Sequence, residues 1–317
     1  MTKLLITVKC KETVKESLIQ EFSDHYDMIF AQGDKEIIAR ELQDAEVVIG
    51  EPDPKLLPSA KNLKWMQITW AGADRYTGNF PENVVLTNAS GAFGRIISEY
   101  TMGMILTQYK RLNQYYVNQQ KKIWADLGSE RSLLSKRVVI LGTGNVGSSI
   151  AQKLHAFGTY NIGINRSGKL PEHFDEVHPL EELDKYLTDA DIVIGALPRT
   201  PYTMGLLDYR RLKLMKEDAL LVNVGRGTMI VTKDLETTLA EGHFSGVILD
   251  VVDPEPLPES SSLWNCDRVL LTPHISGIGF DHEPATEAFI WDICRENLRR
   301  YAAGTPLTHV VDVAAGY

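Results

Sequence analysis

Short apolar runs alternate with amphipathic stretches through the first hundred residues. Runs rich in β-branched side chains predict five strands, at residues 4–8, 28–31, 46–50, 63–69 and 84–87. Between the early runs, residues 14–22 and 36–42 place apolar side chains every three or four positions, which is the spacing of an amphipathic helix. This alternation predicts a small α/β layer with a sheet of its own.

A glycine-rich turn organises the second half of the chain. The apolar run VVIL, residues 138–141, is followed at once by a G-x-G-x-x-G pattern. Its three glycines are Gly142, Gly144 and Gly147. Helical spacing then continues until Gly158, and residues 160–165 form a second strand-like run. The pattern predicts a strand, a tight turn, a helix and a second strand.

The alternation continues to the end of the chain. Further strands are predicted at residues 191–197, 219–224, 246–252 and 269–272, and helices at 180–187, 209–214, 233–240 and 285–301. Strands that are apolar on both faces and separated by helices indicate a parallel, doubly wound sheet. Residues 94–124 predict one long helix that links the two layers, either as a core helix or as a dimer arm.

Composition and charge describe a globular protein whose partners are small molecules. The 317 residues suit two domains, and the formal net charge of -9 argues against a nucleic-acid surface. The first apolar run ends at Lys9, too short for a signal peptide or a membrane span. Cys10, Cys266 and Cys294 lack the spacing of a disulfide framework or a zinc site. We therefore expect a cytoplasmic protein with no membrane partner and no metal.

The glycine-rich turn predicts a dinucleotide site. Gly142 allows the turn, Gly144 lets the backbone approach a pyrophosphate, and Gly147 lets the helix pack closely on the strand. The amino terminus of the helix then faces the phosphates. Methyltransferases carry similar turns, but here the strand, helix and second strand all fall in the required places.

The residues that close the second strand indicate which dinucleotide is bound. An NAD site usually has an acidic residue there, whereas this chain has Asn165, Arg166 and Ser167, with Lys169 two residues further on. A guanidinium beside a hydroxyl suits a 2′-phosphate, so NADP(H) is preferred over NAD(H). The alternative interpretation is an ordinary polar turn on the surface.

Four side chains with suitable chemistry directly follow predicted strands. They are Arg226, Asp250, Glu255 and His274. Ligands of open parallel sheets bind beyond the carboxyl ends of the strands, so these side chains could converge on one crevice. A guanidinium that holds a carboxylate, an imidazole that gives a proton and a carboxylate that orients the imidazole are what reduction of a 2-oxo acid requires.

Plainer interpretations remain open for the same residues. Most of the eight histidines are expected to be surface or packing residues, and His274 stands out only by its place at a strand end. Arg226 could form an ordinary salt bridge. Asp253 competes with Glu255 for the acidic role.

Three motifs together resemble those of the D-isomer-specific 2-hydroxyacid dehydrogenases. NVGRGTMIVTKDL resembles the family's arginine motif, GVILDVVDPEPLP its acidic motif and LLTPHISG its histidine motif. Their order and the GTGNVG turn upstream also match. The sequence Asn165-Arg166-Ser167, where many members have an acidic residue, is more like the glyoxylate and hydroxypyruvate reductase branch, which tends to prefer NADPH.

The resemblance implies a fold and a division of the chain. It implies an α/β protein with a doubly wound, parallel-sheet Rossmann nucleotide domain at residues 98–285. A smaller, flavodoxin-like α/β substrate domain would comprise residues 1–97 and 286–317, with the final helix packed on it. It also implies closure around a cleft and a homodimer formed largely through the nucleotide domains and the long helix.

The resemblance further implies a set of site residues. The catalytic residues would be Arg226, Glu255 and His274. The substrate would be bound by the amides of Gly72 and Ala73 and by Arg226, while the neighbouring Trp70 has no assigned role. The implied cofactor contacts are Gly142, Gly144, Asn145, Val146, Gly147, Asn165, Arg166, Ser167, Pro198, Thr203, Val224, Gly225, Arg226, Asp250, His274 and Ser276.

Two functions are compatible with these motifs. The first is NADP(H)- or NAD(H)-dependent reduction of a small 2-oxo acid, such as glyoxylate, hydroxypyruvate or pyruvate, to the D-2-hydroxy acid, with His274 as acid and base. The second is a dinucleotide-sensing binding protein like the corepressor relatives of this fold. No recruitment segment or extra tail supports the second, so the enzyme is the preferred hypothesis.

Overall fold

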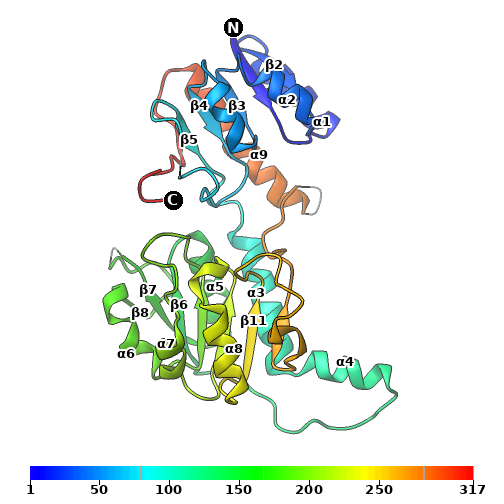
Figure 1. Cartoon of the computed structure of the whole chain (residues 1–317), viewed down its shortest axis with the longest axis vertical. Coiled ribbons are helices and arrows are strands. Elements are labelled where there is room, and N and C mark those ends of the chain that lie inside the picture. The colour runs from blue at the N-terminus through cyan, green and yellow to red at the C-terminus, as the bar shows by residue number, and fades with distance from the viewer. Residues whose placement is uncertain (79, 167, 281–282, 317) are drawn as a thin grey trace. The chain divides into compact units, whose positions relative to one another are not determined.

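The chain separates into two compact units, shown in the computed structural model of Figure 1. The structure describes residues 1–78, 80–166, 168–280 and 283–316. The first unit comprises Met1–Ala92 and Gly279–Tyr317, and the second comprises Phe93–Ile278. Sequence analysis placed the divisions after residues 97 and 285. Each unit has its own sheet and buried core.

A five-stranded sheet forms the centre of the first unit. Its strands are β1 (Thr2–Ile6), β2 (Tyr26–Phe30), β3 (Val47–Ile49), β4 (Trp65–Gln67) and β5 (Val85–Thr87). Their order is β2-β1-β3-β4-β5, and every pairing is parallel. This is the flavodoxin-like order of a doubly wound sheet. The side chains of β3 are fully buried, as expected for a parallel sheet that is covered on both faces.

The last long helix belongs to this first unit. The helices of the unit are α1 (Glu12–Phe22), α2 (Lys35–Glu41), the short 3-10 helix Pro54–Ser59 and α9 (Pro284–Ala302). The Tyr301 ring of α9, orange in Figure 1, stacks on Trp65 with 5.3 Å between ring centroids. The Tyr26 hydroxyl donates to the Leu298 carbonyl at 2.7 Å. The final helix therefore closes the core of the sheet formed by the amino-terminal residues.

A seven-stranded parallel sheet forms the centre of the second unit. Its strands are β6 (Arg137–Leu141), β7 (Tyr160–Ile164), β8 (Glu176–His178), β9 (Ile192–Gly195), β10 (Leu220–Asn223), β11 (Gly246–Leu249) and β12 (Val269–Leu271). Their order is β12-β11-β10-β9-β6-β7-β8, and every pairing is parallel. The strand order reverses between β6 and β9, which is where doubly wound sheets bind their ligands. The predicted α/β fold with a Rossmann sheet is confirmed.

Sequence analysis predicted one helix over residues 94–124, and that prediction was wrong. The structure contains α3 (Gly94–Tyr109) and α4 (Leu112–Gln120), separated by a break at Arg111, whose φ of 51° is left-handed. Helix α4 has no buried residue, so no core contact holds it in line with α3. Figure 1 shows α4 projecting from its unit.

The remaining helices of the second unit connect successive strands. They are α5 (Asn145–Ala156), α6 (Leu183–Leu187), α7 (Tyr209–Leu214) and α8 (Thr232–Ala240), with 3-10 turns at Leu180–Glu182, Gly227–Met229 and Ser262–Asn265. Sequence analysis missed β8, because its three residues are polar or half-buried and form no apolar run. Among the helices of the described residues, none is long and apolar enough to cross a membrane.

Candidate active site

The glycine-rich turn lies at the switch point of the second sheet and leaves room for a phosphate. Gly142 has a φ of 99°, and a Cβ added there would lie 2.8 Å from the Ala196 carbonyl oxygen. A Cβ on Gly147 would lie 1.9 Å from the Gly142 oxygen, so α5 packs against the turn itself. A Cβ on Gly144, in contrast, would meet no atom within 4 Å. The second glycine therefore faces open space.

The amino terminus of α5 opens onto the same space. Gly144 is its N-cap and supplies no side-chain hydrogen bond, and the first turn carries no acidic residue. The first amides of a helix have no partner within it and bear partial positive charge. These features fit the pyrophosphate of a dinucleotide, which the amides of Asn145 and Val146 would hold.

The segment after β7 is tied to the glycine-rich turn. The side-chain nitrogen of Asn165, Nδ2, donates to Thr143 Oγ1 at 2.7 Å, and the side-chain oxygen Oδ1 accepts from the Gly168 amide at 2.7 Å. Asn165 thus shapes the turn on which Arg166 is exposed. Ser167, the third residue expected here, lies outside the described residues.

The segment after β9 is held together by two buried threonines. The Thr203 hydroxyl donates to the Pro198 carbonyl at 2.7 Å and accepts from the Thr200 amide at 2.8 Å. Both threonines are only 7% exposed. The side chain of Thr203 therefore shapes the loop.

His274 and Glu255 are brought together at the carboxyl ends of β12 and β11. His274 Nδ1 lies 3.0 Å from Glu255 Oε2, and Glu255 Oε1 accepts from the Val252 amide at 3.1 Å. An ionised carboxylate can only accept, so Nδ1 carries a proton and Nε2 is the nitrogen left to exchange one with a ligand. Both side chains are exposed, at 50% and 40%. Asp253, the competing candidate, is exposed two residues before Glu255. The carboxylate hydrogen-bonded to the imidazole is that of Glu255.

Asp250 holds the loop that carries His274. It is 2% exposed and accepts from the Thr272 hydroxyl at 2.6 Å and from the amides of Ile275 and Ser276 at 2.9 Å each. Its backbone carbonyl accepts from the His274 amide at 2.8 Å. His274 has a left-handed φ of 56°, an uncommon conformation for a residue other than glycine. These four hydrogen bonds surround the residue and hold that conformation.

Tyr100 joins this network from α3, and sequence analysis missed it. Its hydroxyl lies 2.5 Å from Thr272 Oγ1. Because Thr272 gives its own proton to Asp250, Tyr100 is the donor to Thr272. Burial, together with the nearby Asp250 charge, raises the pKa of Tyr100 to about 12, so the hydroxyl keeps its proton at neutral pH. A tyrosine within a helical pattern gives no sequence signal for such a contact.

Arg226 follows β10 in a tight backbone arrangement. A Cβ on Gly227 would lie 1.9 Å from the Val252 carbonyl oxygen, so the β10 and β11 loops touch through their backbones. The Asn223 side chain donates to the Arg226 carbonyl at 3.0 Å and accepts from the Gly225 amide at 3.2 Å. Val224 is 6% exposed. Arg226, Glu255 and His274 therefore follow three neighbouring strands, β10, β11 and β12.

Gly72 and Ala73 lie in the first unit, on the loop after β4. The Trp70 carbonyl accepts from the Ala89 amide at 2.9 Å, and the Ala71 carbonyl accepts from the Asn88 side chain at 2.8 Å. Trp70 is 44% exposed and Ala73 is buried. The loop is thus fixed by its carbonyl groups.

A carboxylate from the segment after β3, Glu51, is hydrogen-bonded to the start of that loop. Glu51 Oε1 accepts from the Thr69 amide at 2.5 Å and from its hydroxyl at 2.9 Å. Burial raises the pKa of Glu51, although these bonds and the positive charge of Arg75 oppose the shift. Sequence analysis gave no sign of this group.

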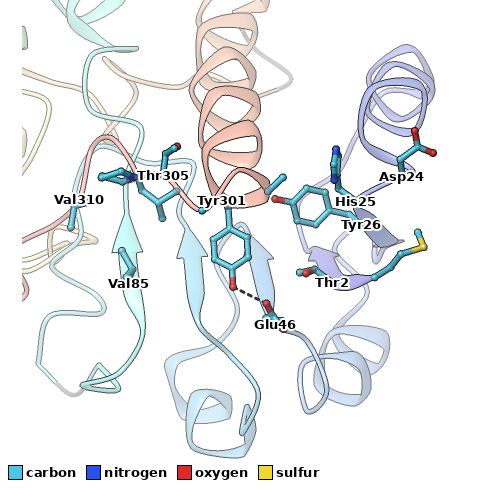
Figure 2. Close-up of a pocket in the computed structure, with 14 residues that line it drawn as sticks. Thr2, Asp24, His25, Tyr26, Glu46, Val85, Tyr301, Thr305 and Val310 are labelled. Carbon is cyan, nitrogen blue, oxygen red and sulfur yellow. Dashed lines mark hydrogen bonds between the residues drawn. The ribbon is translucent and has the colours of Figure 1, made fainter.

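A groove at the other edge of the first sheet is not a candidate for catalysis. Figure 2 shows Thr2, Tyr26 and Val85, which begin three strands, around a groove of about 1090 Å³. The Tyr301 hydroxyl donates to Glu46 there at 2.8 Å. Ligands of doubly wound sheets bind at the carboxyl ends of strands, which is the opposite edge. No group of three or more metal-binding side chains occurs among the residues that the structure describes.

The chain is similar to known proteins. A family model described as "D-isomer specific 2-hydroxyacid dehydrogenase, NAD binding domain" matches residues 102–276. Glyoxylate/hydroxypyruvate reductase A of Serratia proteamaculans is 30% identical over 279 residues, which are 85% of this chain and 87% of that protein. An uncharacterised Corynebacterium melassecola protein encoded in the proB 3′ region is 32% identical over 87% of this chain and 91% of its own length.

Two solved structures resemble the whole chain. A D-isomer-specific 2-hydroxyacid dehydrogenase family protein from Aeromonas salmonicida has a TM-score of 0.88 and 31% identity, covering 98% of this chain and 99% of its own. An NADPH-dependent glyoxylate/hydroxypyruvate reductase from Sinorhizobium meliloti, solved with NADP and sulfate, has a TM-score of 0.85 and 26% identity, covering all of both chains.

Proposed function

Because the chain belongs to the D-isomer-specific 2-hydroxyacid dehydrogenases, we propose that it reduces glyoxylate, hydroxypyruvate or a similar small 2-oxo acid to the D-2-hydroxy acid with NADPH. The protein is an NAD(P)-dependent oxidoreductase. The observation that carries the proposal is the His274–Glu255 hydrogen bond at the carboxyl edge of a sheet that also carries the glycine-rich turn. The two relatives named above with an assigned activity are glyoxylate/hydroxypyruvate reductases, so they lend no support to a corepressor function.

His274 is the proposed acid and base. When bound, the reduced nicotinamide supplies a hydride to the carbonyl carbon of the substrate. His274 gives the proton at Nε2 to the carbonyl oxygen, and takes it back in the reverse reaction. Glu255 fixes the ring through its hydrogen bond with Nδ1.

Arg226 and the loop after β4 are the proposed substrate contacts. The guanidinium offers paired donors in a plane, which suits a carboxylate and the adjacent carbonyl oxygen. The amides of Gly72 and Ala73 would receive the substrate carboxylate. Their loop is fixed through the carbonyls of Trp70 and Ala71, so little ordering is required on binding.

Arg166 is the proposed contact for the 2′-phosphate of NADP(H). It is exposed on the turn shaped by Asn165, where an NAD site usually has a carboxylate. The Sinorhizobium meliloti relative was solved with NADP. We also propose cofactor contacts from Ser167, Pro198, Val224 and Ser276, with Asp250 accepting from the carboxamide.

The test is a set of initial rates with glyoxylate and hydroxypyruvate, measured with NADPH and NADH on the wild type and on Arg166→Ala. We expect the wild type to prefer NADPH and the variant to lose about tenfold or more of that preference, because a charge-assisted hydrogen bond is lost. Equal use of both coenzymes by the wild type would reject the assignment of Arg166.

A second pair of variants tests the chemistry. His274→Ala is expected to lower kcat by about 100-fold or more, the usual contribution of a positioned acid. His155→Ala is the matched control, because His155 is exposed on the last turn of α5. Turnover by His274→Ala at the rate of the control would reject the proposed reaction mechanism.

We further propose a cytoplasmic homodimer. Support for the dimer comes from α4 and the residues after it, where apolar side chains are exposed. They are Leu112, Tyr116, Val117, Ile123 and Trp124. Support for the compartment comes from the three cysteines, which are all free.

A further inference from the structure

We propose that Arg199, on the loop after β9, is a second cation for the 2′-phosphate of NADP(H) and acts together with Arg166. The inference rests on the proposed use of NADPH and concerns a residue to which neither the motifs nor the comparisons give a role. Its basis is the register of the sheet, the rigidity of the loop and the charge of the two segments.

The segments that carry the two arginines leave the sheet at the same level, because the last residues of β7, β6 and β9 pair across the sheet in one row. Ile164, at the end of β7, pairs with Leu141, and Leu141 pairs with Gly195 at the end of β9. Arg166 lies two residues beyond this row and Arg199 four residues beyond it. The two outer strands are about 10 Å apart, a gap that two arginine side chains with a phosphate between them can fill.

The three loops that leave this row are in direct contact. Asn165 hydrogen-bonds Thr143 in the glycine-rich turn, as described above. On the other side, a Cβ on Gly142 would lie 2.8 Å from the Ala196 oxygen and 3.2 Å from Leu197 Cδ2. The loops after β7 and β9 thus flank one turn and form a continuous edge.

Hydrogen bonds fix the backbone of the loop that carries Arg199, while the Arg199 side chain is exposed. The buried Thr203 hydroxyl accepts from the Thr200 amide and donates to the Pro198 carbonyl, the two residues on either side of Arg199. The Gly205 amide donates to the Thr228 carbonyl at 2.8 Å. Arg199 itself is exposed, and no described residue forms a hydrogen bond or ion pair with it. A charged side chain on a fixed loop can meet a ligand without the cost of ordering the backbone.

The charge of the two segments is unusual for this chain. The protein has 42 acidic and 33 basic residues, yet residues 165–170 and 196–207 contain three basic residues and no acidic one. The three are Arg166, Lys169 and Arg199. A positive edge within an acidic protein favours an anion, and the guanidinium fork suits a phosphate.

Calorimetric binding of 2′,5′-ADP and 5′-AMP to the full chain tests the inference without turnover. The two ligands differ only in the 2′-phosphate. We expect Arg199→Ala to weaken 2′,5′-ADP binding about tenfold or more and to leave 5′-AMP binding unchanged. The matched control is Lys213→Ala, which removes one positive charge that is paired with Glu241 on the surface of the same unit. It should change neither affinity.

Arg166→Ala, measured in parallel, separates this inference from the proposed function. Loss of 2′,5′-ADP affinity in Arg166→Ala but not in Arg199→Ala would overturn the inference and leave NADPH use standing. An equal loss for both ligands in Arg199→Ala would place its contact elsewhere on the nucleotide and overturn the inference too. A wild type that binds the two ligands equally would overturn both proposals.

Discussion

The carboxylate of Glu255 orients the imidazole of His274, whereas the nearby carboxylate of Asp253 does not. Glu255→Gln keeps a side chain that can accept from Nδ1 but replaces a charge-assisted hydrogen bond by a weaker neutral one. We expect kcat for 2-oxo acid reduction to fall about 100-fold with the folded state unchanged. Steady-state rates and thermal unfolding of the same preparation measure both.

Asp253→Asn is the matched control for this prediction. Asp253 is exposed, and its backbone carbonyl, which the substitution keeps, accepts from the Thr232 hydroxyl at 2.6 Å. We expect wild-type rates from Asp253→Asn. Equal losses in the two variants would mean that negative charge anywhere near this loop, rather than the charge of the residue hydrogen-bonded to His274, sustains turnover.

Glu51 carries a penalty on stability that depends on pH. Burial raises its pKa in the folded protein above the ordinary value of 4.5, so the folded state holds this proton more tightly than the unfolded chain. At low pH, where Glu51 is protonated in both states, burial of its charge costs nothing. As the pH rises through the raised pKa, Glu51 ionises in the folded protein, and the cost of burying the charge lowers the free energy of unfolding.

Glu51→Gln should remove that penalty while keeping an oxygen that accepts from Thr69. We expect its thermal midpoint to exceed that of the wild type by roughly 2 °C at pH 7.5. The difference should shrink as the pH falls below the ordinary value of 4.5, where the unfolded chain also takes up the proton. A gap that stays constant with pH would refute the assigned cause.

The sequence predicted which residues with suitable chemistry follow the strands, but it did not predict the hydrogen bonds that those residues form. The motifs indicated Glu255 and His274, but Asp253 remained a competitor until the structure joined Glu255 to the imidazole. Glu51 and Tyr100 gave no signal, because their contacts join segments far apart in the chain. Hydrogen-bond geometry depends on the folded backbone, which periodicity does not describe.

Helix α3 and strand β12 together hold the loop of His274, through Tyr100, Thr272 and Asp250. Thr272→Val removes the hydroxyl between the other two and leaves the buried Asp250 carboxylate short of one donor, at a cost of about 1–3 kcal/mol. We expect kcat to fall more than the KM for the 2-oxo acid rises, because the imidazole loses its fixed position.

Thr272→Ser is the rescue variant, because it keeps the hydroxyl between Tyr100 and Asp250. It should restore kcat to near the wild-type value. If both variants lowered the thermal midpoint but left kcat unchanged, the network would support the fold and not the position of His274.

Helices and strands whose apolar residues recur at regular spacing were predicted from the sequence. The two failures, at Arg111 and at strand β8, have physical causes. The pattern over residues 94–124 continued through Arg111, where the structure breaks the helix. The Arg111 guanidinium bonds the Leu127 carbonyl, a contact that periodicity cannot report. Strand β8 escaped notice because half-buried polar residues at a sheet edge carry no apolar run.

The proposed dimer depends on the exposed apolar face of α4. Replacing Tyr116 and Val117 together by Asp should convert the dimer to a monomer in light scattering, because burying the new charges is costly. Ile19→Asp in α1 is the matched control, since Ile19 and Val117 are each 47% exposed. A control that also dissociates, or a double variant that stays dimeric, would contradict α4 as the interface.

The order of strands in the second sheet separates the proposed phosphate-binding loops from the proposed catalytic residues. The loops proposed to hold the dinucleotide phosphates follow β6, β7 and β9, whereas the residues proposed for substrate binding and proton transfer follow β10, β11 and β12. A lineage could therefore exchange one coenzyme for the other by drift in residues 165–170 and 196–207 while selection kept the chemistry intact. Protein engineers have the same freedom, and libraries confined to those two segments are the economical route to an NADH-driven biocatalyst.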